Sequence, residues 1–400
     1  MTIDEAPIVA AREPESGRAS LRSALRLSTG RLMPALLVAI GLADVVTRAL
    51  PIDAFAFRAW EAMLFNRPDD VAFEPHARFD RWTHGDLANI GNLPAHRVYR
   101  RETWTIDAYG FRNPPALAAS GRVQALLLGD SFGAGSGMAD QDTISAQLTE
   151  RGVPTYNVAP AHLTPHAIQV MATRLGMHHG WVLVQKAAGL RYAYVEPPDF
   201  DVVPEARAPV TSWDRFKRNV SRSTWPLRIV AERWLKRWQD DRWFPNPYNR
   251  IVEVRRLANR DTMLFFAGEK LEAPLPAHAL QSIDDTVRVF RELHEALRAT
   301  SLRFAVMLVP DRFGVYAHLI PDSGWPGGQS PYLEELDRRL QAAGVPTINL
   351  HDAMAERATV EAKAFRYLYW RDDTHWNGLG TAVAADVVAA YVSSMARDEP

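Results

Sequence analysis

The sequence predicts an α/β fold of three layers, in which helices cover both faces of a parallel sheet. Short, almost wholly apolar runs of strand length recur between residues 121 and 395, and helical segments separate them. Such runs are typical of strands buried on both faces, and their alternation with helices indicates a parallel sheet. The chain has 400 residues, of which 47% are hydrophobic and 23% charged. A globular chain of this size can bury a sizeable core.

The elements follow one another along this main domain, which we place at residues 121–395. Asp142 is expected to cap the first helix, which Gly152 ends. The order is consistent with a flavodoxin-like doubly wound sheet. Strands are expected at 123–128, 155–159, 181–186, 303–309 and 345–350, and helices at 142–151, 165–176, 283–299, 331–343 and 378–395.

Residues 196–262 interrupt the alternation and are expected to form a helical insertion. Trp234 and Trp238 lie four residues apart, so they would share one helix face. One interpretation is a basic, aromatic surface for an acidic glycan or for membrane headgroups. The interpretation we prefer is an amphipathic insertion whose tryptophans cover the core and whose arginines are solvated. The segment contains five tryptophans, namely Trp213, Trp225, Trp234, Trp238 and Trp243.

The N-terminal part predicts a membrane anchor. Residues 1–31 are polar, carry five arginines and are expected to form a cytoplasmic tail. Residues 32–50 hold an apolar run interrupted by Asp44, which is shorter than the roughly 20 apolar residues of a usual spanning helix. A basic flank before an apolar run is typical of an uncleaved signal anchor. The alternative is a buried helix of a soluble protein. Residues 51–120 are loop-rich and are expected to form a lead-in segment that packs on the main domain.

Composition excludes several functions. The formal net charge is −1, so the chain carries no bulk positive charge for nucleic acid, and no nucleic-acid partner is expected. There are no cysteines, which excludes disulfides, thiol catalysis and cysteine-ligated metals. We expect neither a cofactor nor a metal ion.

A serine follows the first predicted strand. The strand at 123–128 runs directly into Gly129-Asp130-Ser131-Phe132-Gly133. Sites in parallel α/β sheets form at the carboxyl ends of strands. A serine on a tight, glycine-flanked turn exposes its hydroxyl and has backbone N–H groups nearby, as a serine nucleophile requires.

A histidine segment stands about 240 residues later. It reads Asp372-Asp373-Thr374-His375-Trp376-Asn377 and precedes the last predicted helix. A histidine placed there can reach a serine on another strand, and a nearby acid can orient its second ring nitrogen.

Together the two segments resemble the SGNH (GDSL-type) hydrolase superfamily, and more closely its branch of alginate O-acetylation and related exopolysaccharide proteins. The resemblance implies a triad of Ser131, His375 and an acid. Simple esterases of the superfamily would use Asp372, whereas the alginate-acetylation branch, with its Asp-x-His-Trp pattern, would use Asp373. We favour Asp373 because Trp376 follows the histidine.

The resemblance also implies an oxyanion site and substrate contacts. Backbone N–H groups of Ser131 and Ala161 are the expected oxyanion donors. Gln185 is a further candidate, because the asparagine of the superfamily's third block has no counterpart here. Asn157 and Trp376 are expected to contact the substrate.

The function that follows is serine acyl transfer on an extracytoplasmic polysaccharide, by an O-acetyltransferase or an acetylesterase with an acetyl-serine intermediate. The implied partners are a glycan acceptor, a membrane-bound acyl-donor protein and the inner membrane, with the catalytic domain in the periplasm. One alternative is a non-catalytic glycan-binding or scaffolding subunit of an exopolysaccharide export complex. Another is a cytosolic esterase, if residues 32–48 form a buried helix.

Overall fold

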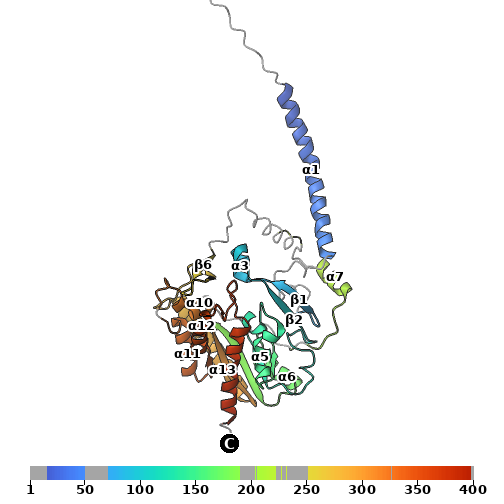
Figure 1. Ribbon diagram of the computed structural model, residues 1–400. Helices are drawn as coiled ribbons and strands as arrows, with labels where there is room; N and C mark the ends of the chain where they lie inside the picture. Colours follow the sequence, from blue (N-terminus) through green and yellow to red (C-terminus); the bar gives the residue numbers. More distant parts are fainter. Residues whose placement is uncertain are drawn as a thin grey trace, which may run out of the picture.

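A five-stranded parallel sheet forms the centre of the fold (Figure 1). The computed structural model describes residues 16–49, 71–189, 203, 205–221, 227, 231, 251–325 and 327–397. The spatial order of the strands is β4-β3-β5-β8-β9, which is the flavodoxin-like order of a doubly wound sheet. The strands are β3 (Ala125–Leu128), β4 (Thr155–Asn157), β5 (Gly180–Ala188), β8 (Leu302–Pro310) and β9 (Thr347–Asn349).

Helices cover both faces of the sheet and complete three layers. Successive side chains of a strand point to opposite faces. Leu126 and Leu128 of β3 therefore pack with one set of helices, and Ala125 and Leu127 pack with the other. The first set is α6 (Pro165–Arg174), α9 (Ala277–Arg298) and α11 (Pro331–Ala342), and the second is α5 (Ile144–Glu150), α12 (His351–Ala362) and α13 (Gly378–Arg397).

The predicted fold class is confirmed, with local differences at element ends. Thr143, and not Asp142, caps α5, because Thr143 is the extended residue whose hydroxyl accepts the Ala146 N–H at 3.3 Å. Helix α9 begins six residues earlier than predicted, directly after Pro276. Helix α12 was not predicted from the sequence.

The insertion at 196–262 is only partly described, and the described part is not all helical. Helix α7 (Ser212–Ser221) agrees with the prediction, and Trp213 on it is exposed. Residues 252–256 instead form strand β6 (Val252–Arg256), which pairs antiparallel with β7 (Thr262–Phe266). The continuous pairing from Val252 opposite Phe266 to Arg256 opposite Thr262 establishes a strand, which corrects the helical prediction there. The other four tryptophans of this segment lie outside the described residues.

The described part of the lead-in packs on the sheet domain. Its antiparallel hairpin of β1 (Arg78–Thr83) and β2 (Arg100–Thr105) precedes β3. Phe73, Trp104 and Phe111 are at most 1% exposed and belong to the same apolar cluster as β3 and β5. The short helical elements between residues 86 and 142 are α3 (Asp86–Ile90), the 3-10 turn Pro94–His96, α4 (Ser131–Ala134) and the 3-10 turn Asp140–Asp142.

Arg112 ties the lead-in to the loop after α4. Its side chain is 2% exposed and lies 4.0 Å from the ring centre of Trp104. The guanidinium donates to Asp140 Oδ1 at 2.9 Å. It also donates to four backbone carbonyls, those of Thr103, Ala134, Gly135 and Met138. One buried cation therefore satisfies five acceptors on two segments.

We expect Arg112→Ala to lower the free energy of unfolding by about 3–5 kcal/mol, because it removes the buried cation that pairs with Asp140 and that donates to four backbone carbonyls. Arg101→Ala is the matched control, since its ion pair with Asp80 has both side chains more than half exposed. Exposed pairs contribute about 0–1 kcal/mol. Urea unfolding followed by tryptophan fluorescence measures both variants. Equal losses for the two would contradict the role given to Arg112.

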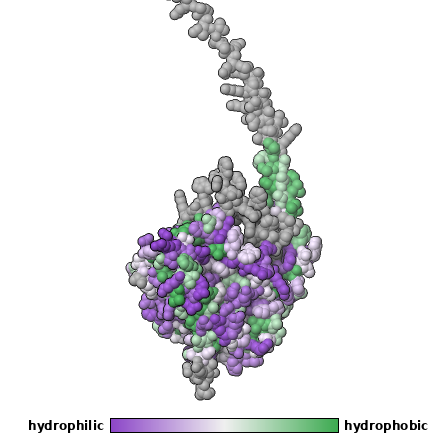
Figure 2. All heavy atoms as spheres, viewed as in Figure 1, coloured by the Kyte–Doolittle hydropathy of each residue, from purple (hydrophilic) through white to green (hydrophobic). Residues whose placement is uncertain are grey.

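Helix α1 (Ser16–Ala49) extends away from the sheet domain (Figure 1). Apolar side chains on its described part are exposed and gather there as a green surface in Figure 2. Its last turn contacts α7, where Arg48 donates to the Val220 carbonyl at 3.2 Å. Among the described residues, the segment long and apolar enough to cross a membrane by length and composition is 378–395, and it lies in α13 rather than in the expected anchor. The exposed apolar residues of α1 are Leu32, Met33, Leu36, Leu37, Val38, Leu42, Val45 and Val46.

Candidate active site

Ser131 stands at the point where the order of the sheet reverses. β3 lies between β4 and β5, and open α/β sheets form sites at the carboxyl ends of strands at such a switch point. The chain leaves β3 through Gly129, which has a φ of +154°. A Cβ atom there would come within 2.5 Å of Gln185 Oε1, so glycine is the residue that fits this turn. Ser131 then opens α4 and is half-buried.

Three side chains brace this turn. Asp130 Oδ1 accepts the Phe132 N–H at 2.8 Å and caps α4. Gln185 Oε1 accepts the N–H groups of Asp130 at 3.1 Å and of Gly133 at 3.0 Å. Asn157 at the end of β4 donates to the Gly133 carbonyl at 2.9 Å. Both neighbours of β3 in the sheet thus hold the serine in place.

The structure brings together Ser131, His375 and Asp373. The Ser131 hydroxyl lies 2.7 Å from His375 Nε2, and His375 Nδ1 lies 2.7 Å from Asp373 Oδ1. His375 is 4% exposed and Asp373 1% exposed. This continuous hydrogen-bonded chain from hydroxyl to carboxylate is the geometry of a serine–histidine–acid triad.

The two neighbouring acids have different surroundings. Asp373 contacts the imidazole, and its Oδ1 also accepts the His375 backbone N–H at 3.1 Å. Asp372 has other partners, because its Oδ2 accepts the N–H groups of Gly85 and Val98, both at 2.7 Å. Burial raises the pKa of Asp372, while the Arg100 guanidinium opposes that rise. The geometry therefore favours Asp373 as the triad acid and gives Asp372 a structural position.

Arg100 joins both acids, and the sequence analysis did not find it. This residue opens β2 and is 6% exposed. Its guanidinium donates to Asp372 Oδ1 at 2.9 Å and pairs with Asp373 Oδ2. It also lies 4.4 Å from the ring centre of Trp370. The planar guanidinium has enough donors to hold two carboxylates at once, which an ammonium group does less well.

Asp86 is a second residue that the sequence analysis missed. It lies at the start of α3 and is 7% exposed. Its Oδ1 accepts the Thr374 N–H at 2.7 Å, which fixes the residue between Asp373 and His375. Gly85 is required beside it, because a Cβ atom there would come within 1.8 Å of the Asp372 carbonyl oxygen. No motif marks Asp86 or Arg100, since their partners lie more than 270 residues away.

Asp86, Asp373 and His375 form the one acid–histidine cluster in the described chain close enough to share a metal ion. Each of these groups already has a protein partner. His375 uses one ring nitrogen for Ser131 and the other for Asp373, and Asp86 holds Thr374. The arrangement therefore suits proton transfer within the chain.

The predicted oxyanion donors differ in whether their hydrogen-bonding groups already have partners. The Ser131 N–H has no acceptor among the described residues, so it is free to donate. The Ala161 N–H is not, because it donates to the Val158 carbonyl at 3.0 Å in a turn. Gln185 presents its oxygen to the serine turn, and its Nε2 is buried without a partner in the described structure. The prediction for Ala161 therefore fails on geometry, and Gln185 is placed as a brace of the turn.

The predicted substrate contacts are buried. Asn157 is 0% exposed, and its oxygen accepts the Ala159 N–H at 3.0 Å. Trp376 is also 0% exposed and donates to the Phe132 carbonyl at 3.2 Å. Its ring meets that of Phe132 edge-on at 5.8 Å. Both side chains contact the turn that contains Ser131, and neither is exposed for contact with a substrate.

A parallel sheet in flavodoxin-like order, with a serine at its switch point and an Asp-x-His segment before the last helix, defines an SGNH-like domain. Residues 257–399 match the family model described as the SGNH hydrolase-like domain of acetyltransferase AlgX. This match confirms the resemblance predicted from the sequence. The matched segment contains Asp373 and His375 but neither Ser131 nor Arg100. No curated protein and no solved structure matches the chain.

We expect Asp373→Asn to lower the rate of activated acetyl-ester cleavage by about 10⁴-fold, because an amide cannot hold the imidazole in the required tautomer. Asp372→Asn is the matched control, and its rate should stay within about tenfold of the unchanged protein, since it does not touch His375. Spectrophotometric assays with 4-nitrophenyl acetate measure both rates. A larger loss for Asp372→Asn would assign the triad acid to Asp372.

Proposed function

We propose that this protein is an O-acetyltransferase that acts on a polysaccharide through an acetyl-serine intermediate. The observation that carries the proposal is the hydrogen-bonded chain from Ser131 through His375 to Asp373. The match to the AlgX acetyltransferase domain supports the acetyl group as the unit transferred. Hydrolysis of the same intermediate by water would make the protein an acetylesterase.

In the first half of the reaction, His375 Nε2 takes the proton from the Ser131 hydroxyl. Oγ then attacks the acetyl carbonyl carbon of the donor ester, and the Ser131 N–H donates to the oxyanion that forms. Asp373 stabilises the imidazolium. The C–O bond to the donor alcohol breaks, that alcohol leaves with the proton from His375, and acetyl-Ser131 remains.

In the second half, an acceptor hydroxyl replaces the donor. His375 takes the proton of a sugar hydroxyl, whose oxygen attacks the acetyl carbonyl carbon. The bond to Ser131 Oγ breaks, and Oγ regains a proton from His375. Proton transfer of this kind contributes about 10²–10⁴-fold to the rate.

Within the described residues, the oxyanion receives one free backbone donor from the predicted set. Losing one such donor costs about 10²–10³ in rate. The occupied Ala161 N–H is the observation that favours the second candidate function, a glycan-binding or scaffolding subunit in an exopolysaccharide export complex. A membrane-bound acyl-donor protein is part of the first proposal and is not needed by the second.

The proposal includes a position outside the cytoplasm, with residues 32–50 as the membrane anchor, residues 1–31 as a cytoplasmic tail and the Ser131 domain in the periplasm. The exposed apolar side chains of α1 support it, because they have no cover in the described structure. Arg48 and Asp44 form an ion pair at 2.7 Å near the end of this helix, so the acid in the apolar run is compensated there.

We expect the unchanged protein to gain one acetyl group on Ser131 when it is mixed with 4-nitrophenyl acetate. Intact-mass and peptide mass spectrometry after rapid acid quenching measure the adduct. Ser131→Ala should carry no adduct, and Ser136→Ala, a matched change in the following loop, should retain it. A protein whose ester turnover is the same with and without Ser131, and which never carries acetyl-serine, would support the scaffolding function instead.

We expect the triad domain to be cut by protease added outside the inner membrane, once the outer envelope is permeabilised. Leu37→Asp should weaken anchoring and move the chain toward the soluble fraction, because an acid in a spanning helix costs about 2.5–3.5 kcal/mol on insertion scales. Immunoblotting of fractions measures both effects. A chain that stays protected until the cells are lysed would place the domain in the cytoplasm and overturn this part of the proposal.

A further inference from the structure

Helix α7 turns an apolar face outward. Trp213, Phe216 and Val220 follow one another at spacings of three and four residues, so they lie on one face of the helix, which we call the outer face of α7. Their exposed fractions are 62%, 40% and 52%. A surface helix of a globular protein normally turns its apolar face toward the core. The orientation of α7 is therefore the reverse of the usual one.

An ion pair on the other side of α7 holds it in this orientation. Arg215 Nε donates to Glu74 Oε1 at 2.9 Å, and the Glu74 side chain is 4% exposed. A roll of the helix that hid its rings would break this pair and leave a buried carboxylate without its cation, which is strongly destabilising. Before the helix, the Arg207 N–H donates to the Ala108 carbonyl at 2.9 Å. The fold therefore fixes the outer face in its exposed position.

The outer face has the residue types of a membrane interface. The rings of Trp213 and Phe216 are stacked, with centres 5.5 Å apart and planes 18° apart. Lys217 lies at the edge of this face, with its Nζ 5.5 Å from the ring centre of Trp213. Tryptophan is enriched at the level of lipid headgroups, and lysine can keep its ammonium in water while its stem lies along an apolar surface. The combination is typical of a helix that lies in the interface of a bilayer.

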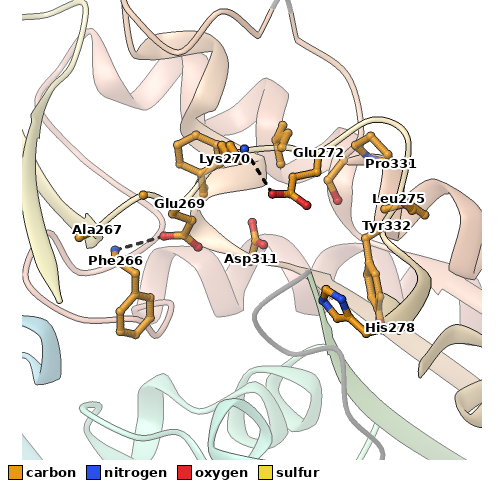
Figure 3. Close-up of a pocket in the computed structure, with 14 residues that line it drawn as sticks. Phe266, Ala267, Glu269, Lys270, Glu272, Leu275, His278, Asp311, Pro331 and Tyr332 are labelled. Carbon is orange, nitrogen blue, oxygen red and sulfur yellow. Dashed lines mark hydrogen bonds and ion pairs between the residues drawn. The ribbon is translucent and has the colours of Figure 1, made fainter. Parts of the chain in front are cut away.

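The outer face differs in this respect from a pocket on the sheet domain. That pocket, of about 270 Å³, opens between the segment after β7 and the start of α9 (Figure 3). Its lining contains charged side chains, of which Lys270 pairs with Glu272 at 3.4 Å. Exposed apolar surface instead marks contact with another protein or with a membrane.

The position of α7 decides between these two partners. Arg48 in the last turn of α1 donates to the Val220 carbonyl at 3.2 Å, so the end of α7 touches the end of α1. Figure 1 shows α7 where α1 meets the domain. Because residues 32–50 are the proposed anchor, α7 stands at the level where the chain leaves the bilayer. The bilayer is therefore the partner that its outer face meets.

We propose that the outer face of α7 inserts into the interfacial layer of the bilayer, so that the domain has a second attachment to the membrane. This rests on the anchor of the proposed function. Apolar burial drives the contact, because Arg215 and Lys217 already have acidic partners in Glu74 and Asp214. The rings reach about 5–10 Å into the boundary between headgroups and acyl chains, as is usual for helices in this layer.

Single labels test this in the full chain, which has no cysteine of its own. Leu37→Cys in the anchor, Phe216→Cys on the outer face and Val360→Cys, at an exposed residue of α12, are each labelled with a nitrobenzoxadiazole dye. The chains are reconstituted into phosphatidylcholine vesicles. We expect the first two labels to emit at shorter wavelength than the third. A quencher near the headgroup should reduce emission from the outer face at least about twofold more than one at the end of the acyl chain.

The labels separate this inference from the proposed function. A label that inserts at Leu37→Cys but stays in water at Phe216→Cys would keep the anchor, overturn the contact of α7 and leave its outer face to a protein partner. The opposite result would retain the contact of α7 and reject the anchor. Ser131→Ala, which cannot carry acetyl, should give the same spectra, so a failure of acyl transfer does not alter this test.

A charge on the outer face provides a second test. Trp213→Glu in the chain labelled at Val220→Cys should return the emission to that of a label in water, because burying a carboxylate in an apolar layer is costly. Val360→Glu in the same labelled chain is the matched control and should leave the emission unchanged. Raised salt should also leave it unchanged, since salt screens charges and not apolar burial. An inserted signal that survives Trp213→Glu, or that is lost in salt, would contradict insertion by the outer face.

Discussion

The buried pairing of Arg100 with Asp372 and Asp373 is the interaction on which the candidate site depends. Buried carboxylates are tolerated when a cation and hydrogen-bond donors compensate them, and removal of one partner is then strongly destabilising. Here a single guanidinium compensates two adjacent acids. Asp373 thus has a cationic partner in addition to His375, while Asp372 accepts hydrogen bonds from the segments that contain Gly85 and Val98. The geometry of the candidate site and the packing of the lead-in consequently depend on the same ion pairs.

The sheet supplies the rest of the alignment. Ser131 is held from both sides, by Gln185 on β5 and Asn157 on β4, because β3 lies between these strands. The position of Ser131 at the carboxyl end of a central parallel strand thus explains why side chains from both neighbouring strands can reach its turn.

Much of the fold could be predicted from the sequence, because strands buried on both faces leave apolar runs such as 303–309. Ser131 and His375 could also be selected, since short motifs around them set local turns. Arg100 and Asp86 could not, because the pairing of buried charges depends on contacts between distant segments. The error at Ala161 has a similar cause. A residue's place in a motif does not reveal whether its N–H already has an acceptor nearby in space.

The long separation between Arg100 and its two acids has a consequence for biosynthesis. The arginine precedes both acids by more than 270 residues, so Arg100 has neither carboxylate partner in a polypeptide that has been synthesised only as far as residue 371. Closing a loop of this length costs conformational entropy, and folds rich in such distant contacts fold more slowly than folds with local contacts. A nascent chain that stops before residue 372 therefore contains Ser131 without the histidine and the acid that lie beside it in the folded protein. A fragment restricted to residues 257–399 would inherit the histidine and its acid without their guanidinium partner or the nucleophile.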